Sequence, residues 1–155
     1  MTALVPDPGP AALRAAGPYA DVDPGLLTIV PGQGTRPVIV PAWSASGAAR
    51  LDPDAFGQYA GVYRLSQRLI GDATDVYTAV NRLEDHLRKL EYNVAAPRSV
   101  GTPDLADFLL VAKSGYCQHF AGSMALMLRM NGIPARVAVG FTSDSGRFDP
   151  DKQSY

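Results

Sequence analysis

The chain has 155 residues, of which 46% are hydrophobic and 19% charged, with a formal net charge of −1. This balance is typical of a folded globular protein and not of a disordered chain. No basic run is present to neutralise phosphates and no apolar stretch approaches the roughly 18 residues of a membrane span, so neither nucleic-acid binding nor a transmembrane helix is expected.

The first fifty residues are rich in proline, which interrupts helices, and we expect them to be loop-like. One apolar run, residues 36–41, is bounded by prolines and predicts an edge strand, where proline is tolerated. Regular structure is expected after Asp52. We therefore predict a loop-rich lead-in over residues 1–52 and a domain, itself incomplete, over residues 53–155.

Three helices are predicted next. Apolar residues at helical spacing indicate a helix over residues 59–70, and residues 71–74 end it and offer caps for the following helix. That second helix has the clearest amphipathic pattern in the chain. Its apolar face comprises Val76, Ala79, Val80, Leu83, Leu87 and Leu90. A short third helix is predicted over residues 104–113, with Leu105, Phe108 and Leu109 facing inward.

The segment from Gly115 to Arg136 is the most informative. Residues 117–130 are apolar on nearly every side, which predicts a central, buried helix, capped by Ser114 or Gly115. The Asn-Gly-Ile-Pro run at 131–134 predicts the helix stop. Residues 135–141 then read as a buried strand, followed by a polar turn over 143–152.

The only cysteine, Cys117, falls in the first turn of the predicted central helix. Free backbone N–H groups and the positive end of the helix dipole favour a thiolate there, and the thiolate is the nucleophilic form of cysteine. The Cys117 backbone N–H is also placed to face an oxyanion on an attacked carbonyl. The alternative is that a lone cysteine beside apolar residues is a small buried hydrophobe.

Neither of the two histidines is a good general base for this sulfur. His119 points about 200° away from Cys117 around the helix, because each residue turns about 100°. We expect His119 to pack against a neighbouring element or reach a surface, and His86 to be half-exposed. Trp43 and Tyr92 could line a cleft, but core or surface packing is the preferred interpretation for both. One cysteine and two histidines do not form a zinc pattern, and no metal or organic cofactor is expected.

Several segments together resemble the core of the transglutaminase-like superfamily, in the form found in bacterial membrane-linked proteins. The most specific are the Gly-Tyr-Cys element at 115–117 and the Gly-Ile-Pro-Ala-Arg element at 132–136, joined by a helix. Supporting segments are 107–110, 118–121, 124–129 and 140–141. The resemblance implies an α+β, papain-like fold, with a helical half followed by the first strands of an antiparallel sheet. It assigns Cys117 to the nucleophile position; Gln118 stands where the family often has glutamate.

The family uses a cysteine, then a histidine, then an aspartate in chain order, and the last two are expected beyond residue 155. The resemblance thus implies a fragment of a longer protein, membrane-anchored and on the extracytoplasmic face of a bacterial membrane. The implied function is a thiol enzyme acting on amide bonds of a protein or peptide substrate through a cysteine thioester, by transamidation or hydrolysis. Two alternatives are a non-catalytic papain-like binding or scaffold module and an inactive truncated product.

Overall fold

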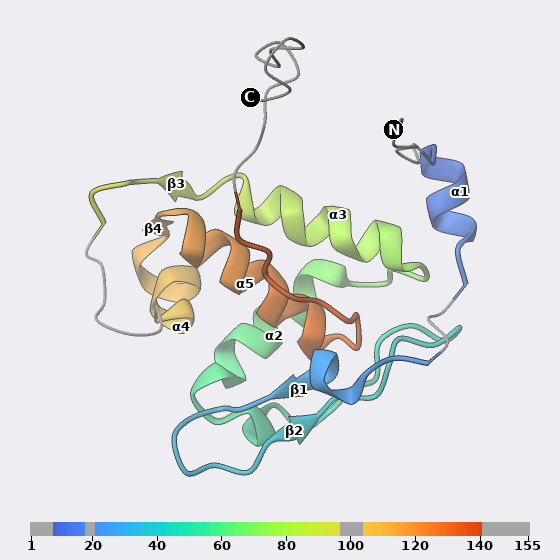
Figure 1. Cartoon of the computed structure of the whole chain (residues 1–155), viewed down its shortest axis with the longest axis horizontal. Coiled ribbons are helices and arrows are strands. Elements are labelled where there is room, and N and C mark those ends of the chain that lie inside the picture. Colours follow the sequence, from blue (N-terminus) through green and yellow to red (C-terminus); the bar gives the residue numbers. More distant parts are fainter. Residues whose placement is uncertain (1–7, 18–20, 97–103, 141–155) are drawn as a thin grey trace, which may run out of the picture.

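The computed structural model describes residues 8–17, 21–96 and 104–140. Helices form around a single central helix, and two short two-stranded sheets lie at its sides (Figure 1). The α-helices are α1 (Pro10–Ala15), α2 (Ala60–Ile70), α3 (Val76–Leu87), α4 (Leu105–Asp107) and α5 (Cys117–Met130). Two 3₁₀ helices, η1 (Pro24–Leu27) and η2 (Pro53–Tyr59), and a π-helix, η3 (Phe108–Ala112), complete the helical part. The strands are β1 (Thr28–Ile29), β2 (Val38–Ile39), β3 (Glu91–Tyr92) and β4 (Ser114–Gly115).

The fold is of the α+β class predicted from the sequence. Strands β1 and β2 pair antiparallel, with Thr28 opposite Ile39, and β2 falls within the predicted edge strand. Strands β3 and β4 pair parallel, with Tyr92 opposite Gly115. Helices α2 and α5 cover nearly the ranges that their apolar spacing predicted, and α3 begins as predicted but ends at Leu87, before Leu90 of the predicted face.

Helix α5 lies between α2, α3 and the sheet β1–β2 (Figure 1). Its inner face buries His119, Ser123, Met127 and Met130, whereas the opposite face is only half-buried. The prediction of a central helix is confirmed, whereas full burial is limited to one face, and Cys117, Gln118 and Ala121 are exposed. Most apolar side chains on the other faces are half-buried against the core.

Two local predictions at helix starts are also corrected. Ser114 and Gly115 do not cap α5, because they are paired in β4, and Tyr116 is the N-cap residue. Asp75, and not a residue of 71–74, caps α3 by accepting a hydrogen bond from the Thr78 N–H at 2.8 Å. The proline-rich start also contains two short helices, α1 and η1, because each has a proline in its first turn, where no N–H is needed.

The predicted buried strand over residues 135–141 is not formed in its described part. Residues 135–140 have no regular structure, and Val137 and Val139 are 47% and 96% exposed. A strand needs a neighbour to accept its backbone hydrogen bonds, and no described segment lies beside this one as a strand. Phe141, the predicted turn over 143–152 and everything after it lie outside the described residues.

The core draws on residues from the predicted lead-in. Ile29, Val40 and Trp43 are buried in the same cluster as Leu83 of α3 and Met127 of α5. Trp43 donates its backbone N–H to the carbonyl of Gly132 at 2.8 Å, just after α5 ends. The boundary at residue 52 stays a prediction, and residues on both sides of it share this core.

Candidate functional site

Cys117 is the first residue of α5, and its side chain is exposed. In the first turn of a helix the backbone N–H groups have no intrahelical acceptors, and the helix dipole presents its positive end. Helix α5 is 14 residues long, so this end carries the field of almost four turns. The sulfur is thus accessible and lies where a thiolate or an oxyanion is stabilised.

The start of α5 is held in place by β4. Asn93 donates its N–H to the Gly115 carbonyl at 2.7 Å, and Glu91 donates to the Lys113 carbonyl at 3.0 Å. These bonds extend the parallel pairing of β3 with β4 up to the residue before the N-cap. The position of Cys117 therefore depends on a strand more than twenty residues earlier in the sequence.

Gly115 has a steric role that the sequence alone did not indicate. A Cβ atom at this position would lie 2.9 Å from Cδ2 of Phe108 and 3.0 Å from Cβ and Cγ of His119. The His119 ring therefore packs directly on the backbone of Gly115, two residues before the cysteine. Only glycine allows this approach.

His119 is buried, with 7% of its surface exposed, and it turns away from the exposed sulfur as predicted. Its Nδ1 accepts the Tyr116 backbone N–H at 3.4 Å. Its ring contacts the rings of Tyr116 and Phe108 at centroid distances of 4.4 and 5.3 Å. His119 is the third residue of α5, the position from which a side chain reaches back to the N-cap N–H. The three-residue spacing from Tyr116 to His119 is visible in the sequence and indicates this cap, although the cap was not predicted.

His86 lies in the last turn of α3 and is half-buried, as predicted. The described structure therefore shows no hydrogen bond between either histidine and the Cys117 sulfur. Trp43, predicted as a packing residue, is 3% exposed and belongs to the core. Tyr92, also predicted to pack, is 60% exposed, and its ring lies 5.8 Å from the ring of Phe120, one turn after Cys117.

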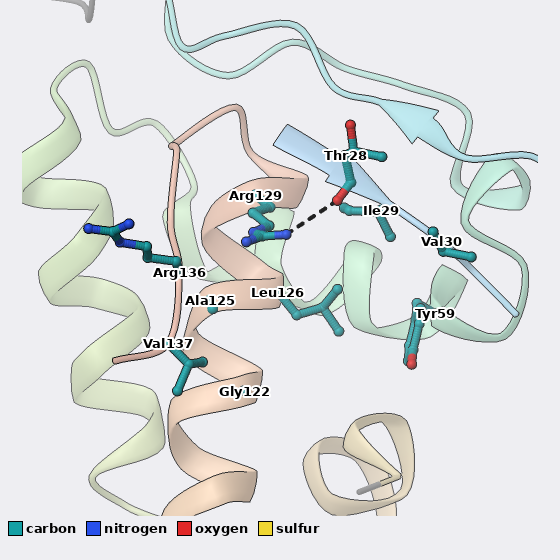
Figure 2. A pocket seen from close by; sticks show the side chains of 10 residues that line it. All are labelled: Thr28, Ile29, Val30, Tyr59, Gly122, Ala125, Leu126, Arg129, Arg136 and Val137. Carbon is teal, nitrogen blue, oxygen red and sulfur yellow. Dashed lines mark hydrogen bonds between the residues drawn. The ribbon is translucent and has the colours of Figure 1, made fainter. Parts of the chain in front are cut away.

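A depression of about 490 Å³ lies along α5, away from its cysteine end (Figure 2). Gly122, Ala125 and Leu126 of α5 line its floor, with Val30 and Val137 on opposite sides. Arg129 stands in it and is engaged by the protein itself, since Nε donates to the Ala135 carbonyl at 2.6 Å and Nη1 to the Thr28 carbonyl at 3.5 Å. This hollow belongs to the half-buried face of α5 and contains none of the predicted site residues.

Over residues 8–17, 21–96 and 104–140, no group of three or more metal-binding side chains lies close enough together to hold an ion. In the same part of the chain, no helix combines the length and the apolar character required to cross a membrane.

Comparison of the sequence with known protein families gives a match. The family model described as "Transglutaminase-like superfamily" matches residues 63–154, more than half of the chain. The chain belongs to the transglutaminase-like superfamily, in agreement with the resemblance of its sequence elements.

Two curated proteins are similar to parts of the chain. A protein-glutamine gamma-glutamyltransferase of Pseudomonas aeruginosa is 44% identical over 54 residues, which are 35% of this chain and 8% of that protein. The uncharacterized protein YebA of Bacillus subtilis is 35% identical over 88 residues, which are 53% of this chain and 12% of that protein. The chain thus spans only a small part of the length of these relatives. No solved structure matches it.

Proposed function

We propose that Cys117 is the nucleophile of a thiol-dependent acyl transfer that acts on carboxamide groups of a protein or peptide. The observation that carries the proposal is the exposed sulfur at the first residue of α5 in a chain of the transglutaminase-like superfamily. A similar protein named protein-glutamine gamma-glutamyltransferase supports glutamine side chains as the carboxamide source.

In the proposed reaction the Cys117 thiolate attacks the carboxamide carbon, and a sulfur–carbon bond forms as the carbonyl becomes an oxyanion. Backbone N–H groups of the first turn of α5 stabilise that oxyanion. The carbon–nitrogen bond then breaks and ammonia leaves with a proton from a general acid, so that a thioester remains. An amine resolves the thioester in transamidation, and water resolves it in hydrolysis.

The reaction needs a base that removes the thiol proton and returns a proton to the leaving amine. His119 is buried and bonded to the Tyr116 N–H, and His86 lies in the last turn of α3, so neither takes this role. The sequence has no third histidine. We therefore propose that the base is supplied from outside this chain, by another part of a longer protein. From the resemblance to bacterial membrane-linked proteins, we also propose that this longer protein is anchored to the outer side of a bacterial membrane.

Alkylation by iodoacetamide across pH tests the nucleophile, because the chain has one cysteine and the modified site is unambiguous. The matched control is the double variant Cys117→Ala/Ala121→Cys, which moves the thiol one turn along the same helix to an exposed position. Below neutral pH we expect Cys117 to react about fivefold faster than the relocated thiol, because a helix start favours the thiolate. Equal rates would contradict an activated nucleophile.

A second candidate function is a binding module without chemistry, favoured by the absence of a histidine base beside Cys117 among the described residues. Such a module would bind glutamine-containing peptides equally well with and without the Cys117→Ala substitution. In that case Cys117 would also show no enhanced alkylation. The two measurements together separate an enzyme from a scaffold.

A further inference from the structure

His119 is the buried titratable side chain closest in sequence to the sulfur, and the proposed reaction does not use it. Four contacts define its environment. Its Nδ1 accepts the Tyr116 N–H, its ring packs against the rings of Tyr116 and Phe108, and its Cβ and Cγ would lie 3.0 Å from any Cβ at Gly115. Three of these contacts fall on Gly115 and Tyr116, the two residues that lead directly into Cys117.

The hydrogen bond links the helix start to the residue before it. A ring nitrogen of histidine that carries no proton is able to accept such a bond. Tyr116 has an extended backbone, with φ −111° and ψ 179°, and Cys117 follows as the first helical residue. The bond from Tyr116 to His119 therefore spans the step at which the backbone changes from strand to helix.

We propose that His119 is a positioning residue for Cys117, which fixes the Tyr116–Cys117 step so that the sulfur stays at the tip of α5. This inference rests on the proposed function, since it assigns a role in presenting the nucleophile. It differs from an acid–base role, because His119 acts on the backbone at Tyr116 and Gly115 and not on the reacting atoms.

The start of α4 borders His119 on another side. A pocket of about 160 Å³ is lined by His119, Ser114, Asp104 and Asp107, the last two from the start of α4. Asp104 accepts hydrogen bonds from the N–H groups of Ala106 and Asp107, at 3.1 and 2.9 Å. The side chain of His119 therefore lies between the start of α5 and the start of α4.

The test uses the full 155-residue chain and two variants of similar volume. His119→Gln keeps an acceptor, and glutamine at this helical position is able to reach the N-cap N–H. His119→Leu keeps the apolar packing and removes the acceptor. The first measurement is amide hydrogen exchange at Tyr116, and the second is the alkylation rate of Cys117.

In His119→Leu we expect Tyr116 amide protection and Cys117 alkylation each to fall by about fivefold, the effect of one lost neutral hydrogen bond. His119→Gln should keep both near the wild-type value. This rescue by a side chain that keeps an acceptor but lacks the ring is a result that a purely packing role would not produce.

Wild-type protection of Tyr116 in His119→Leu would overturn the inference. If that variant does not fold, hydrogen exchange at Tyr116 in the wild type and in His119→Gln decides, and exchange as fast as that of an unprotected amide in both would overturn it. The two proposals fail separately. Slow wild-type alkylation with intact Tyr116 protection rejects the nucleophile alone, and fast alkylation that is independent of His119 rejects the positioning role alone.

Discussion

The side chain of His86 is in an unfavourable place for a charge. Its Nε2 atom is buried and has no hydrogen-bond partner among the described residues. Burial, followed by the positive charges of Lys89 and Lys113, lowers the pKa of His86 below its ordinary value of 6.5. The folded protein therefore favours the neutral ring.

This environment predicts a pH dependence of stability. As pH falls below 6.5, the unfolded chain takes up a proton at His86 while the folded chain does not. The free energy of unfolding should therefore decrease from neutral pH towards the lower folded pKa, and His86→Leu should remove this component. Urea unfolding of both proteins at about pH 7.5 and about pH 5.5 measures it. An identical pH dependence in wild type and variant would contradict the prediction.

At the scale of elements, the C-terminal end of α5 is joined to the lead-in by a close backbone contact. Gly132 has a positive φ of 76°, as expected for the residue after a helix. A Cβ atom there would collide with the Pro41 carbonyl oxygen and lie 2.7 Å from the Trp43 nitrogen. Next to it, the fully buried Asn131 side chain donates to Ser66 of α2 at 3.0 Å and accepts from Gln67 at 2.8 Å. The helix end thus connects the lead-in, α2 and α5.

We predict that Gly132→Ala lowers the free energy of unfolding by about 3 kcal/mol, because backbone atoms leave no room and alanine is strained at positive φ. The matched control is Gly122→Ala in the middle of α5, where the new Cβ would meet only the side chain of Leu105 at 3.3 Å. This control should change stability by less than about 1 kcal/mol, since alanine also favours the helix. Denaturant unfolding compares them, and equal effects would show that the contact is unimportant.

At the scale of the whole molecule, the shared core bears on whether the lead-in unfolds separately from the rest of the chain. Trp43 is the only tryptophan in the chain and is 3% exposed. It lies in the cluster that includes residues of α2, α3 and α5. Its fluorescence therefore reports the environment of a residue from the lead-in inside the core.

We predict that Trp43 fluorescence and far-UV circular dichroism show one coincident thermal transition, because both report the same packed unit. A chain of residues 53–155 alone should lose this cooperative transition, since it lacks Ile29, Val40 and Trp43. A Trp43 transition at clearly lower temperature than helix melting would instead support a lead-in that is independent of the domain.

The sequence by itself determined the family, the α+β class and the helices α2, α3 and α5, including the start of α5 at Cys117. Helical periodicity and the Gly-Ile-Pro stop are local signals, so they survive without knowledge of neighbours. The buried face Ala79, Leu83 and Leu87 follows directly from this spacing.

Only the tertiary structure decided what surrounds these elements. The pairing of β3 with β4 and the contact of Gly132 with Pro41 join residues that are far apart in the sequence and that only the fold brings together. The predicted strand after α5 was wrong for the same reason, because an apolar run forms a strand only beside a partner. Exposure of Cys117 and burial of His119 likewise depend on which side of α5 the other elements cover, and local spacing does not encode that choice.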